Sequence, residues 1–388
     1  MRLTLPRTVI VLGVVSLLND AASEMVTPLL PIFLTATLGA GPAIVGLIEG
    51  AAESAASVLK LVSGWLTDRG WSAKRLVVGG YALSNGVRPL IGLAASWSFV
   101  LALRFLDRVG KGLRTAPRDA MIAAVTTAEI RGRAFGFHRS MDHLGAVVGP
   151  LLAFALLSAG FGVREVFLSS LVIGIAVVAA LVFGVPKDES RPRAVAAPLL
   201  EWRTLDRRLQ RLLLACGALA LATTPEVFLV LWAKDHGLSI TLVPLLWAAA
   251  SVLKMTVALP AGIVSDRVGR LPVLVGGWTL RVLTLAALAW FAPRSAWAIW
   301  TLFLAYAATL AMTESAERSL VGDVAAPSQR GTAFGWYHLV SGLLILPGAL
   351  LFGSLWEWAG SAVAFATAAG VTLAAAVLLL ISIHTRES

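Results

Sequence analysis

Apolar segments long enough to form membrane-spanning helices recur along the whole chain, each separated from the next by a short polar stretch. Six precede a central polar region, at residues 9–33, 43–66, 76–94, 98–124, 134–158 and 166–184, and six follow it, at residues 212–233, 241–264, 272–291, 298–320, 333–354 and 361–383. A helix needs about 20 apolar residues to cross the hydrocarbon of a bilayer. The pattern therefore predicts twelve transmembrane helices in two sets of six.

The composition supports a membrane fold. Hydrophobic residues make up 58% of the 388-residue chain and charged residues only 14%, with a mean hydropathy of +0.82. Such a chain has too little polar surface to cover a water-soluble globule. We expect an all-α integral membrane protein with an N-terminal six-helix bundle over residues 1–185, a basic linker over 186–211 and a C-terminal six-helix bundle over 212–388.

Basic residues are distributed unequally between the predicted loops. The side that holds both termini and the linker carries eighteen Lys and Arg, whereas the opposite side carries three, Arg164, Lys234 and Arg294. Because cytoplasmic loops are enriched in Lys and Arg, both termini are predicted to be cytoplasmic, with the chain in the inner (plasma) membrane. This topology also accounts for the net charge of +10, so we expect no nucleic-acid partner.

Part of the sequence occurs twice. The segment GWLTDR at 64–69 is repeated as GIVSDR at 262–267, and RGRAFG at 131–136 is repeated as RGTAFG at 330–335. The two offsets, 198 and 199 residues, are close to half the length of the chain. Such a repeat indicates an internal duplication in which each copy forms half of a pseudo-symmetric structure.

The first repeated segment places a glycine, an acid and an arginine at the cytoplasmic end of the second helix of each half. The residues are Gly64, Asp68 and Arg69 in the first copy, and Gly262, Asp266 and Arg267, followed by Gly269 and Arg270, in the second. A glycine at this point permits close approach of another helix, and the carboxylate can accept hydrogen bonds from a neighbouring helix N-terminus. We interpret each copy as a latch between helices at the membrane surface.

The second copy reads Gly-x-x-x-Asp-Arg-x-Gly-Arg, which resembles the motif between helices two and three of the major facilitator superfamily. The segment from Arg104 to Gly112 resembles the fourth-helix pattern of that family, with its membrane-buried arginine. The motif Gly145-x-x-x-Gly149-Pro150 resembles the fifth-helix pattern associated with antiporters. The resemblance implies two six-helix bundles that rock against each other, with the latch motif stabilising the outward-facing state.

Ionisable residues lie inside the predicted spans, fifteen in the first half and six in the second. Each costs roughly 2.5 to 3.5 kcal/mol at a helix centre, so such residues should face a cavity or one another. The candidates for proton coupling and for lining a cavity are Asp20, Glu24, Glu49, Glu53, Arg104, Arg108, Asp142, Glu226, Glu314 and Glu317. Several of them are spaced three or four residues apart, which places them on one helix face.

Two interpretations of these charges are open. In the first, a buried carboxylate takes up and releases a proton, with a nearby cation setting its affinity. In the second, the acids and the cations of the fourth helix form static ion pairs that fix helix packing. We favour the static interpretation for Asp107 and Asp119, and an intrahelical pair accounts for Glu314 and Arg318, which are four residues apart.

These features predict a secondary active transporter that moves a small organic solute by alternating access and is coupled to protons. The glycine-proline motif favours efflux by antiport, whereas the cationic fourth helix favours the alternative, uptake of an anionic metabolite by symport. A non-transporting membrane receptor or scaffold is a third alternative. We expect no enzyme activity, no cofactor and no metal, and the expected partners of the monomer are a small-molecule substrate, protons and the lipid bilayer.

Overall fold

The computed structural model describes residues 5–185, 202–291, 293, 295–325 and 330–384, and the side chains of a few helical residues, Asp68 among them, are not described. Helices, and no strands, are found in this part of the chain. Ten of these helices are long and apolar enough to cross a membrane, judged on length and composition alone. The prediction of an all-α membrane protein is confirmed.

In the first half, each predicted span coincides with one helix or with a helix and a short continuation. The elements are α1 (Arg7–Val26), α2 (Leu30–Ile32), the π-helical turn η1 (Phe33–Thr37), α3 (Pro42–Asp68), α4 (Ala73–Val87), the 3-10 turn η2 (Pro89–Leu93), α5 (Trp97–Ala124), α6 (Ala128–Ser158) and α7 (Val163–Gly184). Of the predicted linker, residues 186–201 lie outside the described residues.

The second half continues with η3 (Trp202–Thr204), α8 (Arg207–Ala222), α9 (Glu226–Asp235), η4 (Ile240–Leu242), α10 (Val243–Val268), α11 (Arg270–Trp290), α12 (Ala296–Val324), α13 (Arg330–Ala359) and α14 (Ser361–His384). The apolar segment 212–233 forms two helices rather than one. The break falls at Thr223 to Pro225, because Pro225 has no backbone N–H to continue the helix and instead precedes the first turn of α9.

Two of the twelve predicted spans are not among the ten apolar helices, for different reasons. α4 has 15 residues and passes into the 3-10 turn η2 at Pro89. α5 is long enough, with 28 residues, but seven of them, from Arg104 to Asp119, are ionisable. Charge is therefore concentrated in one helix, and these charged side chains must find partners within the protein.

The helices group into two compact units. Unit 1 comprises Met1–Leu38, Ala55–Ala197 and Ile240–Ala248, and unit 2 comprises Gly39–Ser54, Pro198–Ser239 and Ala249–Ser388. α3 and α10 therefore each contribute residues to both units.

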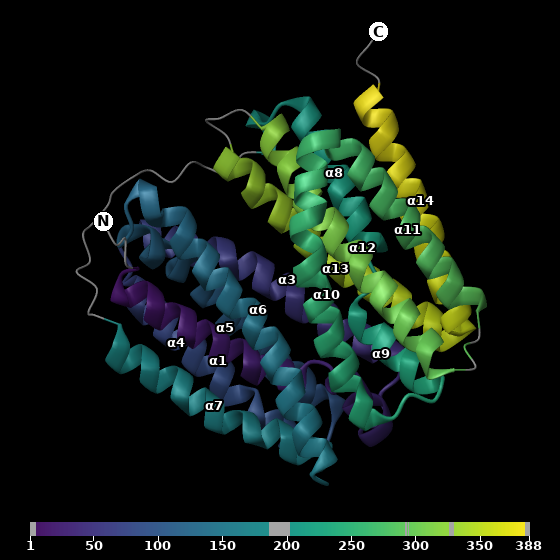
Figure 1. The fold of residues 1–388 in the computed structure, drawn as a ribbon, viewed down its shortest axis with the longest axis horizontal. Helices are drawn as coiled ribbons and strands as arrows, with labels where there is room; N and C mark the ends of the chain where they lie inside the picture. The colour runs from purple at the N-terminus through teal and green to yellow at the C-terminus, as the bar shows by residue number, and fades with distance from the viewer. Residues whose placement is uncertain (1–4, 186–201, 292, 294, 326–329, 385–388) are drawn as a thin grey trace. The chain divides into compact units, whose positions relative to one another are not determined.

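In unit 1, α1 lies along α6, and α4 lies along α5 (Figure 1). The close approach of α1 and α6 depends on two glycines of α6. A Cβ atom at Gly145 or Gly149 would meet the carbonyl oxygen of Leu17 or Ala21, respectively. The glycines of the fifth-helix motif therefore allow backbone-to-backbone packing against α1.

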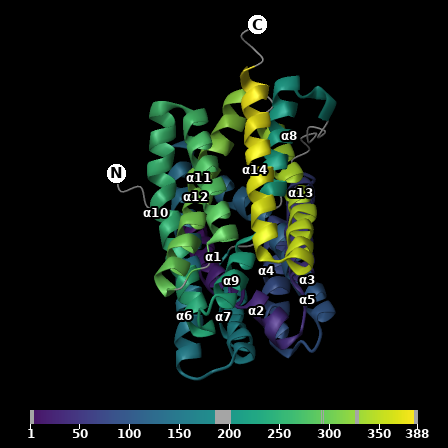
Figure 2. The ribbon, with the colours of Figure 1, turned by 90° about the vertical axis from the view of Figure 1, so that its right-hand side faces the viewer.

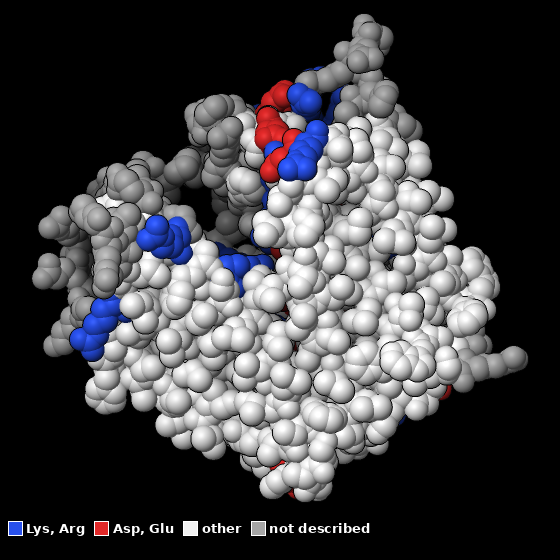
Figure 3. Space-filling view, viewed as in Figure 1, with Lys and Arg blue, Asp and Glu red and all other residues white. Residues whose placement is uncertain are grey.

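In unit 2, α8 packs against α13 and α14, which lie side by side in Figure 2. The first half of α3 also belongs to this unit, where the Ser54 hydroxyl donates to the Gly342 carbonyl of α13 at 2.7 Å. Charged side chains are few on the face drawn in Figure 3, most of which is uncharged, as expected for a surface in contact with lipid.

We predict that Gly149→Leu destabilises the protein, because the new side chain would meet the backbone of α1, which cannot yield as a flexible side chain can. The expected loss is about 1–3 kcal/mol in the free energy of unfolding, measured by thermal or denaturant unfolding in detergent. The matched control is Gly136→Leu in the same helix, where a Cβ atom meets open space and stability should be retained. Equal stability of the two variants would contradict this packing.

Candidate functional site

A polar cavity of about 370 Å³ lies in unit 1 between α1, α3, α5 and α6. α1 contributes Asn19, Asp20, Ser23 and Glu24, which are spaced so that they share one face of the helix. Glu24 accepts a hydrogen bond at 2.8 Å from the indole nitrogen of Trp247, which lies in the part of α10 that belongs to unit 1.

α5 supplies most of the positive charge of the cavity. Arg108, Lys111, Arg114 and Arg118 recur every three or four residues and therefore line the cavity from one helix face. α3 adds Lys60 from its second half. Arg118 is also ion-paired with its neighbour Asp119, at 2.9 Å, as the static interpretation of Asp119 predicts.

α6 contributes Arg139, Asp142 and His143. Asp142 is held on both sides, because the hydroxyl of Ser16 on α1 donates to one carboxylate oxygen and Nδ1 of His138 lies 3.6 Å from the other. The hydrogen bond from Ser16 ties Asp142 to the same helix that carries Asp20 and Glu24.

Six basic and three acidic residues line this cavity, so its formal charge is +3 with His143 neutral. The three acids, Asp20, Glu24 and Asp142, and the base Arg108 were all candidates from the sequence. The cavity can therefore offer several cationic donors to a negatively charged group, close to carboxylates that can be protonated.

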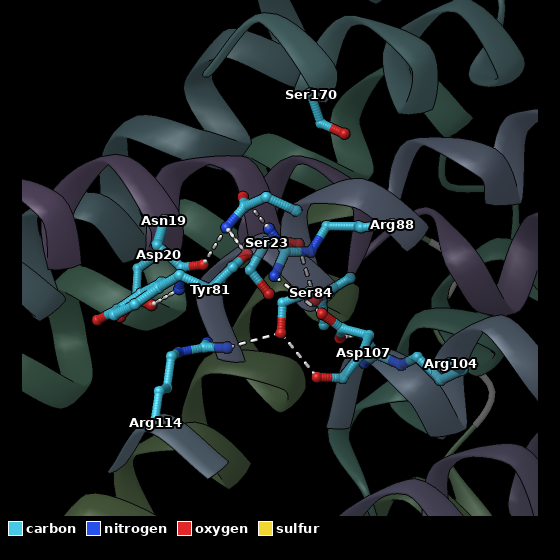
Figure 4. Close-up of polar contacts among 12 residues, drawn as sticks. Asn19, Asp20, Ser23, Tyr81, Ser84, Arg88, Arg104, Asp107, Arg114 and Ser170 are labelled. Atoms are coloured by element: carbon cyan, nitrogen blue, oxygen red, sulfur yellow. Dashed lines mark hydrogen bonds and ion pairs between the residues drawn. The ribbon is translucent and has the colours of Figure 1, made fainter. Parts of the chain in front are cut away.

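A fully buried ion pair joins the end of α4 to α5 (Figure 4). Arg88 donates to Asp107 at 3.0 Å, and Arg104 approaches the other carboxylate oxygen at 3.4 Å. The exposed fraction of each of these side chains is 1% or less. The static interpretation of Asp107 fits this geometry, with partners three and nineteen residues away in the sequence.

A third buried arginine connects this pair to the cavity. Arg114 donates to the hydroxyl of Ser84 at 2.6 Å, and that hydroxyl donates to the backbone carbonyl of Asp107 at 2.8 Å. The Arg114 guanidinium also lies over the Tyr81 ring, 4.5 Å from its centroid. Three buried arginines thus surround one buried aspartate between α4 and α5.

Other candidates do not line the cavity. Glu49 and Glu53 lie in the first half of α3, which packs with α13 in unit 2. Their spacing places them on one face of α3, but spacing alone does not determine which helix that face contacts. Arg104 is buried against Asp107 instead.

The candidates of unit 2 are dispersed. Glu226 is ion-paired with Lys254 at 2.8 Å, and Glu314 with Arg318 at 2.8 Å, the intrahelical pair that the spacing predicts. Glu317 accepts long hydrogen bonds of 3.4 Å from Trp278 and Tyr337.

The second copy of the latch motif makes its contacts at the ends of α10, α11 and α12. Arg270 is hydrogen-bonded to Asp266 and to Asp323, the latter at 3.2 Å, whereas Arg267 is exposed. Gly269 has a φ of 96°, a conformation that favours glycine, in the one-residue connection between α10 and α11. Asp323 was not expected from the sequence, because it lies 53 residues from Arg270.

In the first copy, the side chain of Asp68 lies outside the described residues. Arg69 lies over the Trp65 ring, 3.8 Å from its centroid. A Cβ atom at Gly64 would meet Ala116 of α5 at 3.5 Å, so α3 and α5 are in ordinary contact there. No group of three His, Cys, Asp or Glu that could hold a metal ion is found among the described residues.

Sequence reasoning missed Asn19, Asn85, Arg114 and Arg139 as parts of this site. The two amides are uncharged, so a count of charges inside the spans does not find them. Their burial, with exposed fractions of 1% and 2%, is what marks them in the structure. An asparagine inside an apolar span is the sequence signal that could have identified them.

The chain is similar to known membrane transporters over most of its length. The family model of the Major Facilitator Superfamily matches residues 12–253 and, a second time, residues 212–388. An uncharacterised MFS-type transporter of Methanocaldococcus jannaschii is 30% identical over 360 residues, which cover 91% of this chain and 89% of that protein.

Two further comparisons concern transporters with named substrates or effects. The multidrug resistance protein MdtH of Aeromonas hydrophila subsp. hydrophila is 24% identical over 344 residues, which cover 89% of this chain and 86% of that protein. The crystal structure of the nucleoside transporter NupG matches with a TM-score of 0.78 at 13% identity, over 97% of this chain and 99% of that chain. The likeness to NupG shows a shared fold.

We predict that Asp107→Asn destabilises the protein by about 3–5 kcal/mol, because it leaves the buried guanidiniums of Arg88 and Arg104 without their counter-charge. The measurement is denaturant unfolding in detergent. Glu314→Gln, which breaks the exposed pair with Arg318, is the control and should change stability by no more than about 1 kcal/mol. Similar losses in both variants would argue against a special role for the buried pair.

Proposed function

The chain belongs to the Major Facilitator Superfamily of membrane transporters, and from this premise we propose that it carries a small organic anion together with protons by alternating access. The observation that supports the anion is the excess of six basic over three acidic residues around the cavity of unit 1. Its volume of about 370 Å³ lies within the range of small-molecule pockets.

The coupling to protons follows from the same charge balance. When Asp20, Glu24 or Asp142 is protonated, the positive excess of the cavity increases, and an anion binds more tightly. By thermodynamic reciprocity, a bound anion also favours protonation. Mutual strengthening is the relation that symport requires, because proton and solute then cross together. Antiport requires that they compete.

Efflux by antiport is the second candidate, and a different observation supports it. The relative MdtH is named a multidrug resistance protein, and the fifth-helix glycine-proline motif is present in this chain. In the structure, however, Gly145 and Gly149 have a packing role against α1, which a symporter needs as much as an antiporter does. The cavity charge is the observation on which we propose symport rather than antiport.

We infer that the chain lies in the cytoplasmic membrane with both termini in the cytoplasm, from the eighteen-to-three distribution of Lys and Arg. That it acts as a monomer, and that it divides into two bundles joined by a linker at 186–211, are parts of the same proposal. Arg270, bonded to Asp266 and Asp323, is proposed as the contact that holds the cytoplasmic ends of α10, α11 and α12 together.

We predict that an external organic anion acidifies the lumen of proteoliposomes that contain the protein. The experiment uses vesicles loaded with a pH-sensitive dye and a panel of carboxylates, phosphate monoesters and sulfonates, with neutral and cationic analogues as controls. Symport carries protons inward with the anion, so lumenal pH falls. Alkalinisation would instead support efflux by antiport, and a response confined to cations would exclude the anion proposal.

We predict that Lys60→Gln raises the KM for the anion found in this panel by about tenfold, because one cationic donor of the cavity is lost. Arg207→Gln is the matched control, since Arg207 is exposed at the start of α8 and does not line the cavity. The measurement is initial uptake rate against anion concentration. An unchanged KM in Lys60→Gln would show that the substrate does not use this charge.

A further inference from the structure

Two buried asparagines connect the cavity to the buried arginine cluster. Asn85 on α4 accepts a hydrogen bond from Arg88 at 3.2 Å and donates one to Asn19 on α1 at 3.1 Å. Asn19 in turn donates to the carboxylate of Asp20 at 3.0 Å. An unbroken row of hydrogen bonds therefore runs from the Arg88 guanidinium to a carboxylate that lines the cavity.

The direction of every hydrogen bond in this row is fixed by its first member. A guanidinium can only donate, so the oxygen of the Asn85 amide must face Arg88. The nitrogen of Asn85 then faces the oxygen of Asn19, and its second hydrogen is used by the backbone carbonyl of Tyr81 at 2.9 Å. The nitrogen of Asn19 is consequently turned toward Asp20. All the dipoles point the same way, and the last one is a donor.

A donor directed at a carboxylate oxygen favours the ionised form of that carboxylate, because the ionised oxygen accepts the hydrogen bond more strongly than a protonated one does. We propose that Asn85 and Asn19 are positioning residues that form a polarised hydrogen-bonded row, through which the buried Arg88 stabilises the ionised form of Asp20. The row thereby sets the pH at which Asp20 takes up the proton that accompanies the anion. This inference rests on the proposed function, in which Asp20 carries a proton.

The positive charge at the Arg88 end of the row favours only the ionised form of Asp20. Arg88, Arg104 and Arg114 are buried near Asp107, which is ion-paired with Arg88 and Arg104, so these four side chains together are positive. Both oxygens of Asp107 are already occupied by Arg88 and Arg104. Arg88 donates to Asp107 through one terminal nitrogen and to Asn85 through the other, so it can act on both.

Asp20 also faces charged and titratable groups on the other elements around it, which the experiment keeps constant. They are Glu24 on its own helix, Lys60 on α3, Tyr81 on α4, Arg108, Lys111, Arg114 and Arg118 on α5, and His138, Arg139, Asp142 and His143 on α6. α7, which also packs against α1, has its ionisable residues, Arg164 and Glu165, in its first turn, where Arg164 donates to backbone carbonyls of Gly92 and Ala94.

The test is an infrared titration of the full chain in lipid vesicles without substrate, following the carbonyl stretch of protonated carboxyl groups from acid to alkaline pH. The Asp20 band is identified as the one that Asp20→Asn removes. In Asn85→Leu the row is cut, protonation becomes easier, and the midpoint of this band should move to higher pH by about one unit, as expected for the loss of a hydrogen bond to a charged oxygen. Asn19→Leu should act in the same direction.

A near-isosteric variant covers the case in which Asn85→Leu does not fold. In Asn85→Asp, the new carboxylate pairs with Arg88 and the Asn19 amide turns its nitrogen toward it, so that its oxygen faces Asp20. Only a protonated Asp20 can match that oxygen, and the midpoint should move further to higher pH. The double variant with Asp20→Asn identifies the band of the added acid.

Ser170→Ala is the control, because Ser170 is equally buried in the same unit but donates only to its own helix, at the Phe167 carbonyl. Its Asp20 midpoint should equal that of the unaltered protein. Midpoints that stay constant or fall in the Asn85 and Asn19 variants would overturn the proposed row alone. The absence of any band removed by Asp20→Asn would instead overturn the proton-carrying role of Asp20 in the proposed function.

Discussion

Ionised side chains inside a bilayer must find their partners within the protein, because hydrocarbon offers none. In unit 1 this constraint is met by gathering Arg88, Arg104 and Arg114 around Asp107, which binds α4 to α5. The arrangement satisfies the aspartate fully but leaves positive charge in excess. That excess continues into the cavity, where Asp20 and the other acids face it. The contacts that hold the helices together therefore also determine which ligand charge the cavity favours.

The two repeated halves both contain a hydrogen bond from an arginine to a hydroxyl between equivalent helices, but the residues that form it differ. A Gly-Gly-aromatic sequence occurs in α4 and, 197 residues later, in α11, and Ser84 and Arg281 follow it at the same distance. In unit 1, Arg114 of α5 donates to Ser84 at 2.6 Å, whereas in unit 2 Arg281 donates to Thr313 of α12 at 2.7 Å. Each helix pair keeps an arginine-to-hydroxyl hydrogen bond, but the arginine comes from the opposite helix.

The sequence predicts the helices well and the site in part. The length of apolar segments depends on local composition, so the spans could be predicted, and charge inside a span identifies Asp20 and Asp142 as residues with polar surroundings. Spacing on one helix does not reveal which helix lies opposite, and for this reason Glu53 was grouped with them although it lies with unit 2. The contact between Asn85 and Asn19 spans 66 residues and two uncharged side chains, so only the fold brings it to light.

Equivalent positions of the two repeated halves can carry side chains of opposite charge. Arg118 of α5 and Glu317 of α12 are 199 residues apart, the offset of the second repeated segment, and they carry opposite charges. Arg118 lines a cavity rich in cations, whereas Glu317 is surrounded by aromatic donors, Trp278 and Tyr337. A charge at this position is tolerated with either sign because its partners are supplied locally within each unit. Duplication therefore conserves the backbone but lets the charge differ between the units, and this difference is what the proposed anion site in unit 1 would use.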